Sequence, residues 1–77
     1  MEKLSKREFE VLEGIVLGFS NPKIGEILGI SKETVKIYVR EIFRKLDADN
    51  RVIAAVAAVK SGIISTAEAK KHFLYKK

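Results

Sequence analysis

Residues 21–46 read NPKIGEILGISKETVKIYVREIFRKL, and this stretch decides the fold. Its second part predicts a helix, because apolar side chains recur there at a spacing that places them on one stripe at about 100° per residue. The stripe comprises Val35, Val39, Ile42 and Leu46. We expect it to face a hydrophobic core.

The opposite face of this helix is mostly basic. It carries three cations, one aliphatic side chain and one acid near the start of the helix: Lys36, Arg40, Arg44, Ile37 and Glu33. A basic helical face of this kind suits the major groove of DNA, where base edges present hydrogen-bond acceptors.

A second, shorter helix precedes this one. Residues 22–28 place apolar side chains at helical spacing, and Gly29 follows at the position of a C-cap. Ile30 then completes a tight turn, and the hydroxyl of Ser31 can accept a hydrogen bond from the first turn of the next helix. The pattern is that of a helix-turn-helix. An ordinary corner between two helices is the alternative.

Gly25 lies where the two crossing helices would come closest. Glycine costs roughly 1 kcal/mol of helix propensity relative to alanine. We therefore expect close packing at this position to compensate.

Length and composition allow one domain with one small core, since the chain has 77 residues, 47% of them hydrophobic. The absence of cysteine excludes disulfides and thiolate zinc sites. The longest apolar run, residues 52–59, is far shorter than the roughly 20 residues that span a bilayer, and residues 1–20 lack the layout of a signal peptide. We expect a cytoplasmic protein.

The chain is basic, with a formal net charge of +5 and a pI near 9.6. This balance favours a polyanionic partner. Many small helical proteins are equally basic without binding nucleic acid, so the charge alone does not decide the function.

Helices are also expected on both sides of the central stretch. Ser5 and Glu8 form a capping box that starts a first helix, and Gly18 marks its end. A fourth helix runs from about residue 50 to residue 61, with Gly62 as its C-cap.

The C-terminal segment carries a second capping box, formed by Ser65 and Glu68. It predicts a short fifth helix, on which Ala69, Phe73 and Leu74 share one side. We expect residues 65–77 to be a C-terminal extension of a domain that covers residues 1–64.

Nothing in the sequence predicts an enzyme. There is no phosphate-binding loop and no set of nucleophile, base and acid, and we interpret the carboxylates as helix caps and surface charges. His72 is the only histidine, and without a cysteine or second histidine near it we interpret it as a surface imidazole. We expect no metal, no cofactor and no small-molecule ligand.

Motifs along the four main helices occur in a specific order and spacing. They are Leu4 to Glu8, Gly18 to Asn21, Ile24 to Leu28, Ile30 to Ser31, Thr34 to Lys36, Ile42, Lys45 to Leu46, Asn50 to Arg51, and Ala54. Together they resemble the LuxR/FixJ/NarL/GerE family of DNA-binding domains. The resemblance implies an all-α four-helix bundle whose third helix enters the major groove, a role in transcription regulation, and binding as a dimer through the fourth helix.

The resemblance also assigns roles to single residues. Lys36, Ile37 and Arg40 would reach base edges, since Lys and Arg suit guanine acceptors and Ile suits a thymine methyl group. The expected phosphate contacts are Ser20, Asn21, Lys23, Thr34, Tyr38, Arg44 and Lys45.

Three positions depart from the usual pattern of the family. Tyr38 replaces a common histidine, Pro22 removes an amide that could have faced DNA, and Glu41 replaces a common asparagine. An acid at position 41 would be repelled by phosphates. We therefore expect Glu41 to pair with Arg44 or Lys45, three and four residues further on.

The outward side of the fourth helix carries an excess of apolar residues. If Ala54, Ala55 and Ala58 face the bundle, the residues that point away from it are Val52, Ile53, Val56 and Val59. Such a seam predicts a homodimer whose two third helices lie about one DNA turn apart on a palindromic site. In the alternative, the fifth helix folds back, covers Val52 and Val56 with Phe73 and Leu74, and leaves a monomer.

Two functions from different classes remain open. The first is a sequence-specific regulator that binds double-stranded DNA through a single effector domain, with RNA polymerase as a further candidate partner. The second is a protein-interaction module that sequesters a homologous regulator or another partner. Lys36, Arg40 and Arg44 favour DNA, whereas Glu33 and Glu41 keep the alternative open. Since no receiver or ligand-binding domain fits in this length, we expect control through the abundance of the protein or through a partner.

Overall fold

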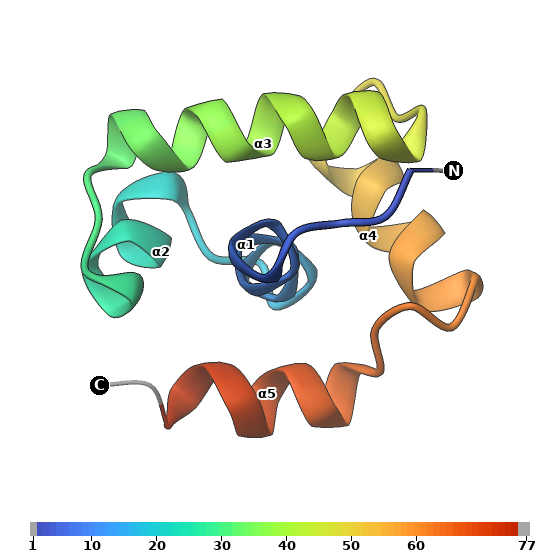
Figure 1. Cartoon of the computed structure of the whole chain (residues 1–77). Coiled ribbons are helices and arrows are strands. Elements are labelled where there is room, and N and C mark those ends of the chain that lie inside the picture. The colour runs from blue at the N-terminus through green and yellow to red at the C-terminus, as the bar shows by residue number, and fades with distance from the viewer. Residues whose placement is uncertain (1, 76–77) are drawn as a thin grey trace.

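Five α-helices form in residues 2–75, the part of the chain that the computed structural model describes (Figure 1). No strand forms in that range, so the predicted all-α class is confirmed. The helices are α1 (Lys6–Val16), α2 (Asn21–Leu28), α3 (Lys32–Leu46), α4 (Arg51–Lys60) and α5 (Thr66–Leu74). None of them is both long and apolar enough to cross a membrane.

Each helix begins at a side chain whose oxygen accepts from a backbone amide three residues on, as an N-cap does. The caps are Ser5, Ser20, Ser31, Asn50 and Ser65. The capping box at Ser5 is complete, because the Glu8 carboxylate also accepts from the Ser5 amide at 2.9 Å. At Ser65 only the first half is present among the described residues, with the Glu68 amide donating to the hydroxyl at 3.2 Å.

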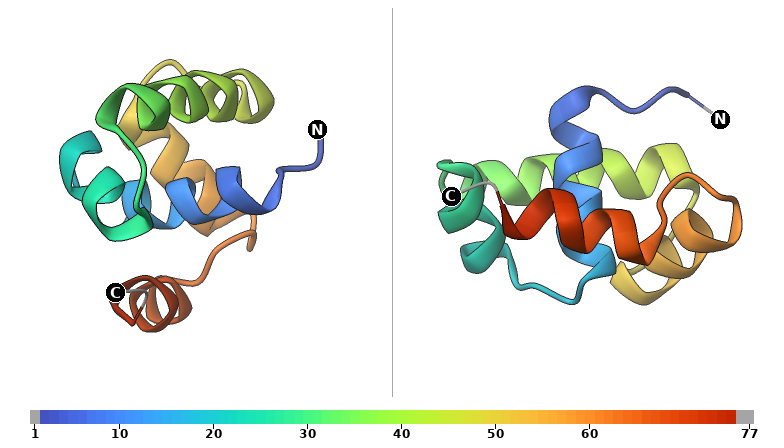
Figure 2. Two further views of the ribbon diagram at one scale, coloured as in Figure 1. Left: turned by 60° about the vertical axis from the view of Figure 1, so that its left-hand side comes forward. Right: turned by 90° about the horizontal axis from the view of Figure 1, so that it is seen from below.

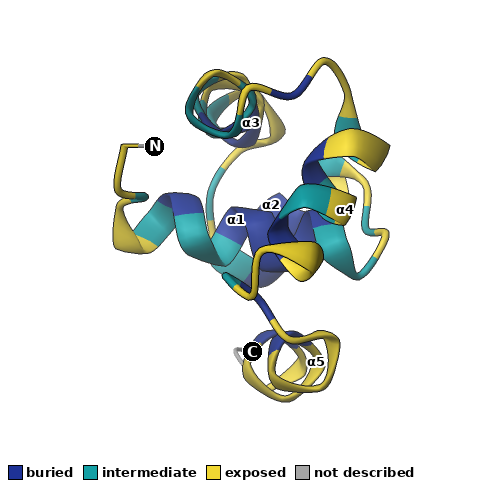
Figure 3. Cartoon of the chain, turned by 90° about the vertical axis from the view of Figure 1, so that its right-hand side faces the viewer, coloured by how far each residue is buried: buried dark blue, intermediate teal, exposed yellow. Residues whose placement is uncertain are grey.

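The helix α1 lies at the centre of the molecule, with α3 on one side of it and α5 on the other (Figure 1). The turned views in Figure 2 show the same order of layers, and α2 closes the end of the molecule where α3 begins. Buried residues line the inner faces of the helices (Figure 3). The largest fully buried side chains are Val11, Leu12, Ile24, Val35, Ile42 and Phe73.

The helix α5 belongs to this core through Ala69 and Phe73. Phe73 is fully buried, and its ring centroid lies 5.6 Å from that of Phe19. We expected Leu74 on the same side of the helix as Ala69 and Phe73, but Leu74 is 45% exposed at the C-terminal end of α5, whereas the other two are buried. Successive residues on a helix point about 100° apart, so Phe73 and Leu74 cannot both face α1.

The outward face of α4 is not covered by α5. Val52 and Val56 are 70% and 55% exposed, because α5 packs against α1 instead. The alternative in which Phe73 and Leu74 fold back over these valines is therefore wrong. The division of the chain at residue 64 stays a prediction.

Two glycines inside helices allow close approaches. A Cβ atom on Gly25 would lie 2.5 Å from the carbonyl oxygen of Ile30, so the turn between α2 and α3 occupies the space that a side chain would need. A Cβ atom on Gly14 would lie 2.7 Å from Cγ1 of Ile24 and 2.9 Å from Cζ of Phe73. The close packing expected at Gly25 is confirmed, whereas the role of Gly14 carries no signal in the sequence pattern.

We predict that Gly25→Ala lowers the free energy of unfolding by about 1–3 kcal/mol, because the new methyl group meets backbone that cannot rotate away. The intrinsic preference of alanine for a helix works in the opposite direction by about 1 kcal/mol. Urea denaturation followed by circular dichroism measures the change. Glu26→Ala, at an exposed position of the same helix, is the control. A variant at Gly25 that is as stable as the control would contradict the close approach.

Candidate nucleic-acid interface

The apolar stripe of α3 packs into the core and thereby fixes which face of this helix is exposed. Val35, Val39 and Ile42 are buried against the other helices, so the opposite side of α3 must face solvent. The predicted base-contact residues all lie on that exposed side: Lys36, Ile37 and Arg40. Ile37 is 64% exposed although it is aliphatic. Ile37 thus lies beside two cations that have no acidic partner in residues 2–75, an arrangement that can meet both guanine and thymine in a major groove.

The turn before α3 fixes the orientation of this face. The amide of Ile30 donates to the Gly25 carbonyl at 2.9 Å, and the hydroxyl of Ser31 accepts from the Thr34 amide at 3.0 Å. The same hydroxyl lies 3.0 Å from Oγ1 of Thr34. The side chain of Thr34 is thus placed at the first turn of α3, beside the cap.

The N-terminus of α2 is tied to α4 by Arg51. Its guanidinium donates to Oδ1 of Asn21 at 2.7 Å and to the carbonyl oxygen of Phe19 at 2.6 Å. Arginine can only donate, so the amide oxygen of Asn21 must face Arg51 and its NH₂ group must point the other way. Burial lowers the pKa of the Arg51 guanidinium, which nevertheless stays cationic at neutral pH.

A hollow of about 310 Å³ joins this corner to the exposed face of α3. Three helices contribute to it, and its lining residues are Asn21, Lys36, Val39, Arg40, Phe43 and Arg51. Residues that are distant in the sequence therefore meet in one depression, where three cations lie beside Asn21 and two apolar side chains. Ser20 and Lys23 are exposed at the same end of α2.

The C-terminal end of α3 differs, because its cations already have acidic partners. Arg44 forms a two-pronged ion pair with Glu2, with Nη1 and Nη2 at 2.6 and 2.9 Å from the two carboxylate oxygens. The same guanidinium donates from Nε to Glu41 at 3.1 Å, so the expected pairing of Glu41 with Arg44 is confirmed. Hydrogen bonds from Arg44 lower the pKa values of Glu2 and Glu41, and these two acids raise the pKa of Arg44.

Lys45 lies in a more buried pair. Its amine donates to Glu8 at 2.8 Å and to the carbonyl oxygen of Lys3 at 3.1 Å, and its side chain is only 13% exposed. Burial by itself would raise the pKa of Glu8, but hydrogen bonds from Lys45 and Ser5 outweigh this effect and lower the pKa below its usual value of 4.5. The phosphate contacts expected of Tyr38, Arg44 and Lys45 stay predictions.

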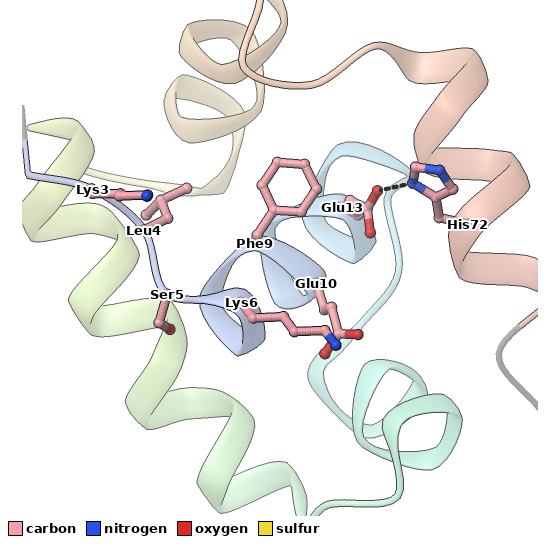
Figure 4. Close-up of a pocket in the computed structure, with 8 residues that line it drawn as sticks. All are labelled: Lys3, Leu4, Ser5, Lys6, Phe9, Glu10, Glu13 and His72. Carbon is pink, nitrogen blue, oxygen red and sulfur yellow. Dashed lines mark hydrogen bonds and ion pairs between the residues drawn. The ribbon is translucent and has the colours of Figure 1, made fainter.

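One carboxylate was assigned wrongly to the surface or to a cap. Glu13 is 2% exposed, and its Oε2 atom lies 3.0 Å from Nδ1 of the exposed His72 (Figure 4). The pair sits at one edge of a hollow of about 460 Å³ between the N-terminal segment, α1 and α5. Pairing across 59 positions has no local sequence signal. No group of three or more candidate metal ligands occurs in residues 2–75.

The outward face of α4 is apolar, as expected. Ala54 and Ala58 are fully buried, whereas the four residues of the predicted seam are 43–70% exposed: Val52, Ile53, Val56 and Val59. Association through this face stays a prediction.

Comparisons with known proteins identify a family for this chain. Residues 2–58 match bacterial regulatory proteins of the luxR family. The uncharacterized transcriptional regulatory protein YxjL of Bacillus subtilis is 41% identical over 63 residues, which cover 82% of this chain and 29% of that protein. The nitrate/nitrite response regulator protein NarP of Escherichia coli is 42% identical over 53 residues, which cover 69% of this chain and 25% of that protein. The transcriptional regulatory protein DegU of Brevibacillus brevis is 44% identical over 59 residues, which cover 77% of this chain and 25% of that protein. The chain therefore spans about a quarter of the length of these relatives.

The pair between Glu8 and Lys45 should make stability depend on pH. A carboxyl whose pKa is lower in the folded chain stabilises the fold above its unfolded pKa, and this contribution is lost as the pH falls through the folded value. We predict that Glu8→Gln lowers the free energy of unfolding by about 1–3 kcal/mol at neutral pH and by less at about pH 3. Glutamine can still accept from the Ser5 amide, so the variant isolates the charge.

Urea denaturation at the two pH values measures this difference. Glu26→Gln, which removes an exposed pair with Lys23, is the control and should change stability by no more than about 1 kcal/mol. An equal cost of Glu8→Gln at both pH values would show that the charge of Glu8 does not contribute.

Proposed function

Because the chain belongs to the luxR family of bacterial regulatory proteins, we propose that it regulates transcription by binding double-stranded DNA at specific sequences. The observation that carries this proposal is the exposed face of α3, where Ile37 lies beside two cations that have no acidic partner in the described range 2–75. The turn after α2 fixes the start of this helix. The proposed site of action is the cytoplasm. RNA polymerase remains a candidate partner to which no residue is assigned.

In the proposed complex α3 enters the major groove. Lys36 and Arg40 are long enough to reach guanine acceptors, and Ile37 lies beside them on the same exposed face, where it can contact a thymine methyl group. Neither cation has a hydrogen bond or ion pair to an acid in residues 2–75 that would have to break first.

The phosphate contacts of the proposal surround this face. Ser20, Asn21 and Lys23 lie at the N-terminus of α2, where amides and the helix dipole favour an anion. The NH₂ group of Asn21 is turned away from Arg51, has no hydrogen bond within residues 2–75, and can donate to a phosphate oxygen. Thr34, Tyr38 and Lys45 are the remaining proposed phosphate contacts. Arg44 lies at the same end of α3 as Lys45, where Glu2 and Glu41 hold its guanidinium.

The proposed assembly on DNA is a symmetric dimer through α4. Four exposed apolar side chains on one short helix are more than a surface facing only water requires. The buried alanines on the inner side of α4 keep that helix close to α1, which leaves the valines outermost. A two-fold axis at this face would set the two α3 helices about one DNA turn apart.

We predict that Lys36→Ala and Arg40→Ala each cost about 1–3 kcal/mol on the preferred duplex and little on random DNA. A duplex selected from a random pool supplies the preferred site, and anisotropy titrations measure binding to both. Lys60→Ala removes one exposed cation from the end of α4 and is the charge control. Equal losses on both duplexes would show that the cations only neutralise phosphate. Selection of no duplex would favour the protein-interaction module.

We predict that the intact chain dimerises and that Val56→Glu is a folded monomer, because the new charge lies in the seam and Val56 is half-exposed in one protomer. Sedimentation equilibrium over a range of concentrations measures association, and circular dichroism checks the fold. Leu74→Glu places the same charge on a similarly exposed apolar residue at the far end of α5 and should leave the dimer intact (Figure 1). A monomeric intact chain at high concentration would contradict the dimer.

A further inference from the structure

The cation at the C-terminal end of α3 is enclosed by two acids. All three nitrogens of the Arg44 guanidinium that carry donors point to a carboxylate of Glu2 or Glu41. Glu41 lies three residues earlier on the same helix. Glu2 belongs to the N-terminal segment, which runs toward the C-terminal end of α3 in Figure 1. At least one donor on each nitrogen that could bind a phosphate is therefore already used by an acid.

The arrangement imitates phosphate recognition. A planar guanidinium fork binds two oxygens of a carboxylate in the same way as two oxygens of a phosphate. With two acids around one cation, the cluster of Glu2, Glu41 and Arg44 carries a net negative charge. The neighbouring cation, Lys45, is neutralised by Glu8. This end of α3 thus lacks the net positive charge of its N-terminal half.

A phosphate could displace these acids from Arg44 but could not remove them from the site. The ion pairs are exposed, and water and salt screen exposed pairs strongly, so each one is weak enough for a competing anion to break. Both acids are tethered within a few ångströms, so their local concentration stays high and their charges still repel the incoming phosphate.

We infer that Glu2 and Glu41 withhold Arg44 from DNA, so that Arg44 is a latent phosphate contact and the N-terminal half of α3 sets the electrostatic footprint. The inference rests on the proposed binding of DNA by α3. Under this inference, Glu2 and Glu41 limit the affinity of the protein for duplex DNA and the dependence of that affinity on salt.

A double-mutant cycle tests this inference. Arg44→Ala in the intact chain should change affinity for duplex DNA less than about twofold. Glu2→Gln combined with Glu41→Gln should tighten binding on the order of tenfold and steepen the slope of log K against log salt by about 0.9, the value for one additional phosphate. Arg44→Ala in that background should remove both gains. Glutamine keeps hydrogen-bonding oxygens at both positions, and circular dichroism verifies the fold.

Glu68→Gln is the charge control, since Glu68 lies on α5, across α1 from α3 (Figure 2). It should leave affinity within about twofold, and Arg44→Ala in its background should act as in the intact chain. If the double variant is unfolded, Glu2→Gln alone repeats the cycle, because Glu2 lies outside every helix.

Two results would overturn the inference alone. One is a loss of about 0.9 in the salt slope when Arg44→Ala is made in the intact chain, which would show that Arg44 already contacts phosphate. The other is a gain in DNA affinity from the double variant that persists when Arg44 is replaced. Glu2 and Glu41 would then act only by repelling DNA, without any effect on Arg44. Failure of the intact chain to bind any duplex would overturn the proposed function as well, so the two failures are distinguishable.

Discussion

The interface depends on the contact between Gly25 and the turn that follows its helix. The amide of Ile30 donates to the Gly25 carbonyl, and the Ile30 carbonyl lies where a side chain on residue 25 would have to be. This contact brings the turn onto α2 and allows Ser31 to start α3 at once. The direction of α3, and with it the orientation of its exposed cations relative to the N-terminus of α2, follows from a missing methyl group. A side chain at this position would push apart α2 and α3, the two helices that carry the proposed DNA contacts.

The parts of the fold that sequence reasoning predicted are local. Caps, helix ends and the apolar stripe of α3 depend on residues three or four positions apart, and all five helices occur where those patterns indicate. The parts that it missed join distant segments. Arg44 meets Glu2 across 42 positions, and Glu13 meets His72 across 59. No periodicity records such a pairing, because the partners are brought together by the packing of whole helices. For the same reason Glu13 was assigned to the wrong environment.

The N-terminal segment links the start of α1 to the end of α3. One oxygen of Glu8, Oε1, accepts both from the Ser5 amide and from the amine of Lys45, so a helix cap and a tertiary ion pair share a single atom. The Lys3 carbonyl accepts from the same amine, and Glu2 continues to Arg44. Loss of the Glu8 charge would therefore loosen the cap of α1 and the end of α3 together. Arg44 and Lys45, the two cations at this end of α3, thus both bind acids of the protein itself.

The helix α4 faces both the proposed DNA site and the proposed dimer seam. Its first residue, Arg51, holds the oxygen of Asn21 and thereby directs the NH₂ group of Asn21 away from α4, while its outward side presents Val56 and the other exposed apolar residues. This helix of ten residues contains no proline or glycine, the residues at which helices commonly kink. A partner docked on the valines would thus be placed, through one rigid element, at a defined distance from the N-terminus of α2. Under the proposal, the spacing of the two DNA half-sites is set by the packing of α4 on α1, since no flexible connection intervenes.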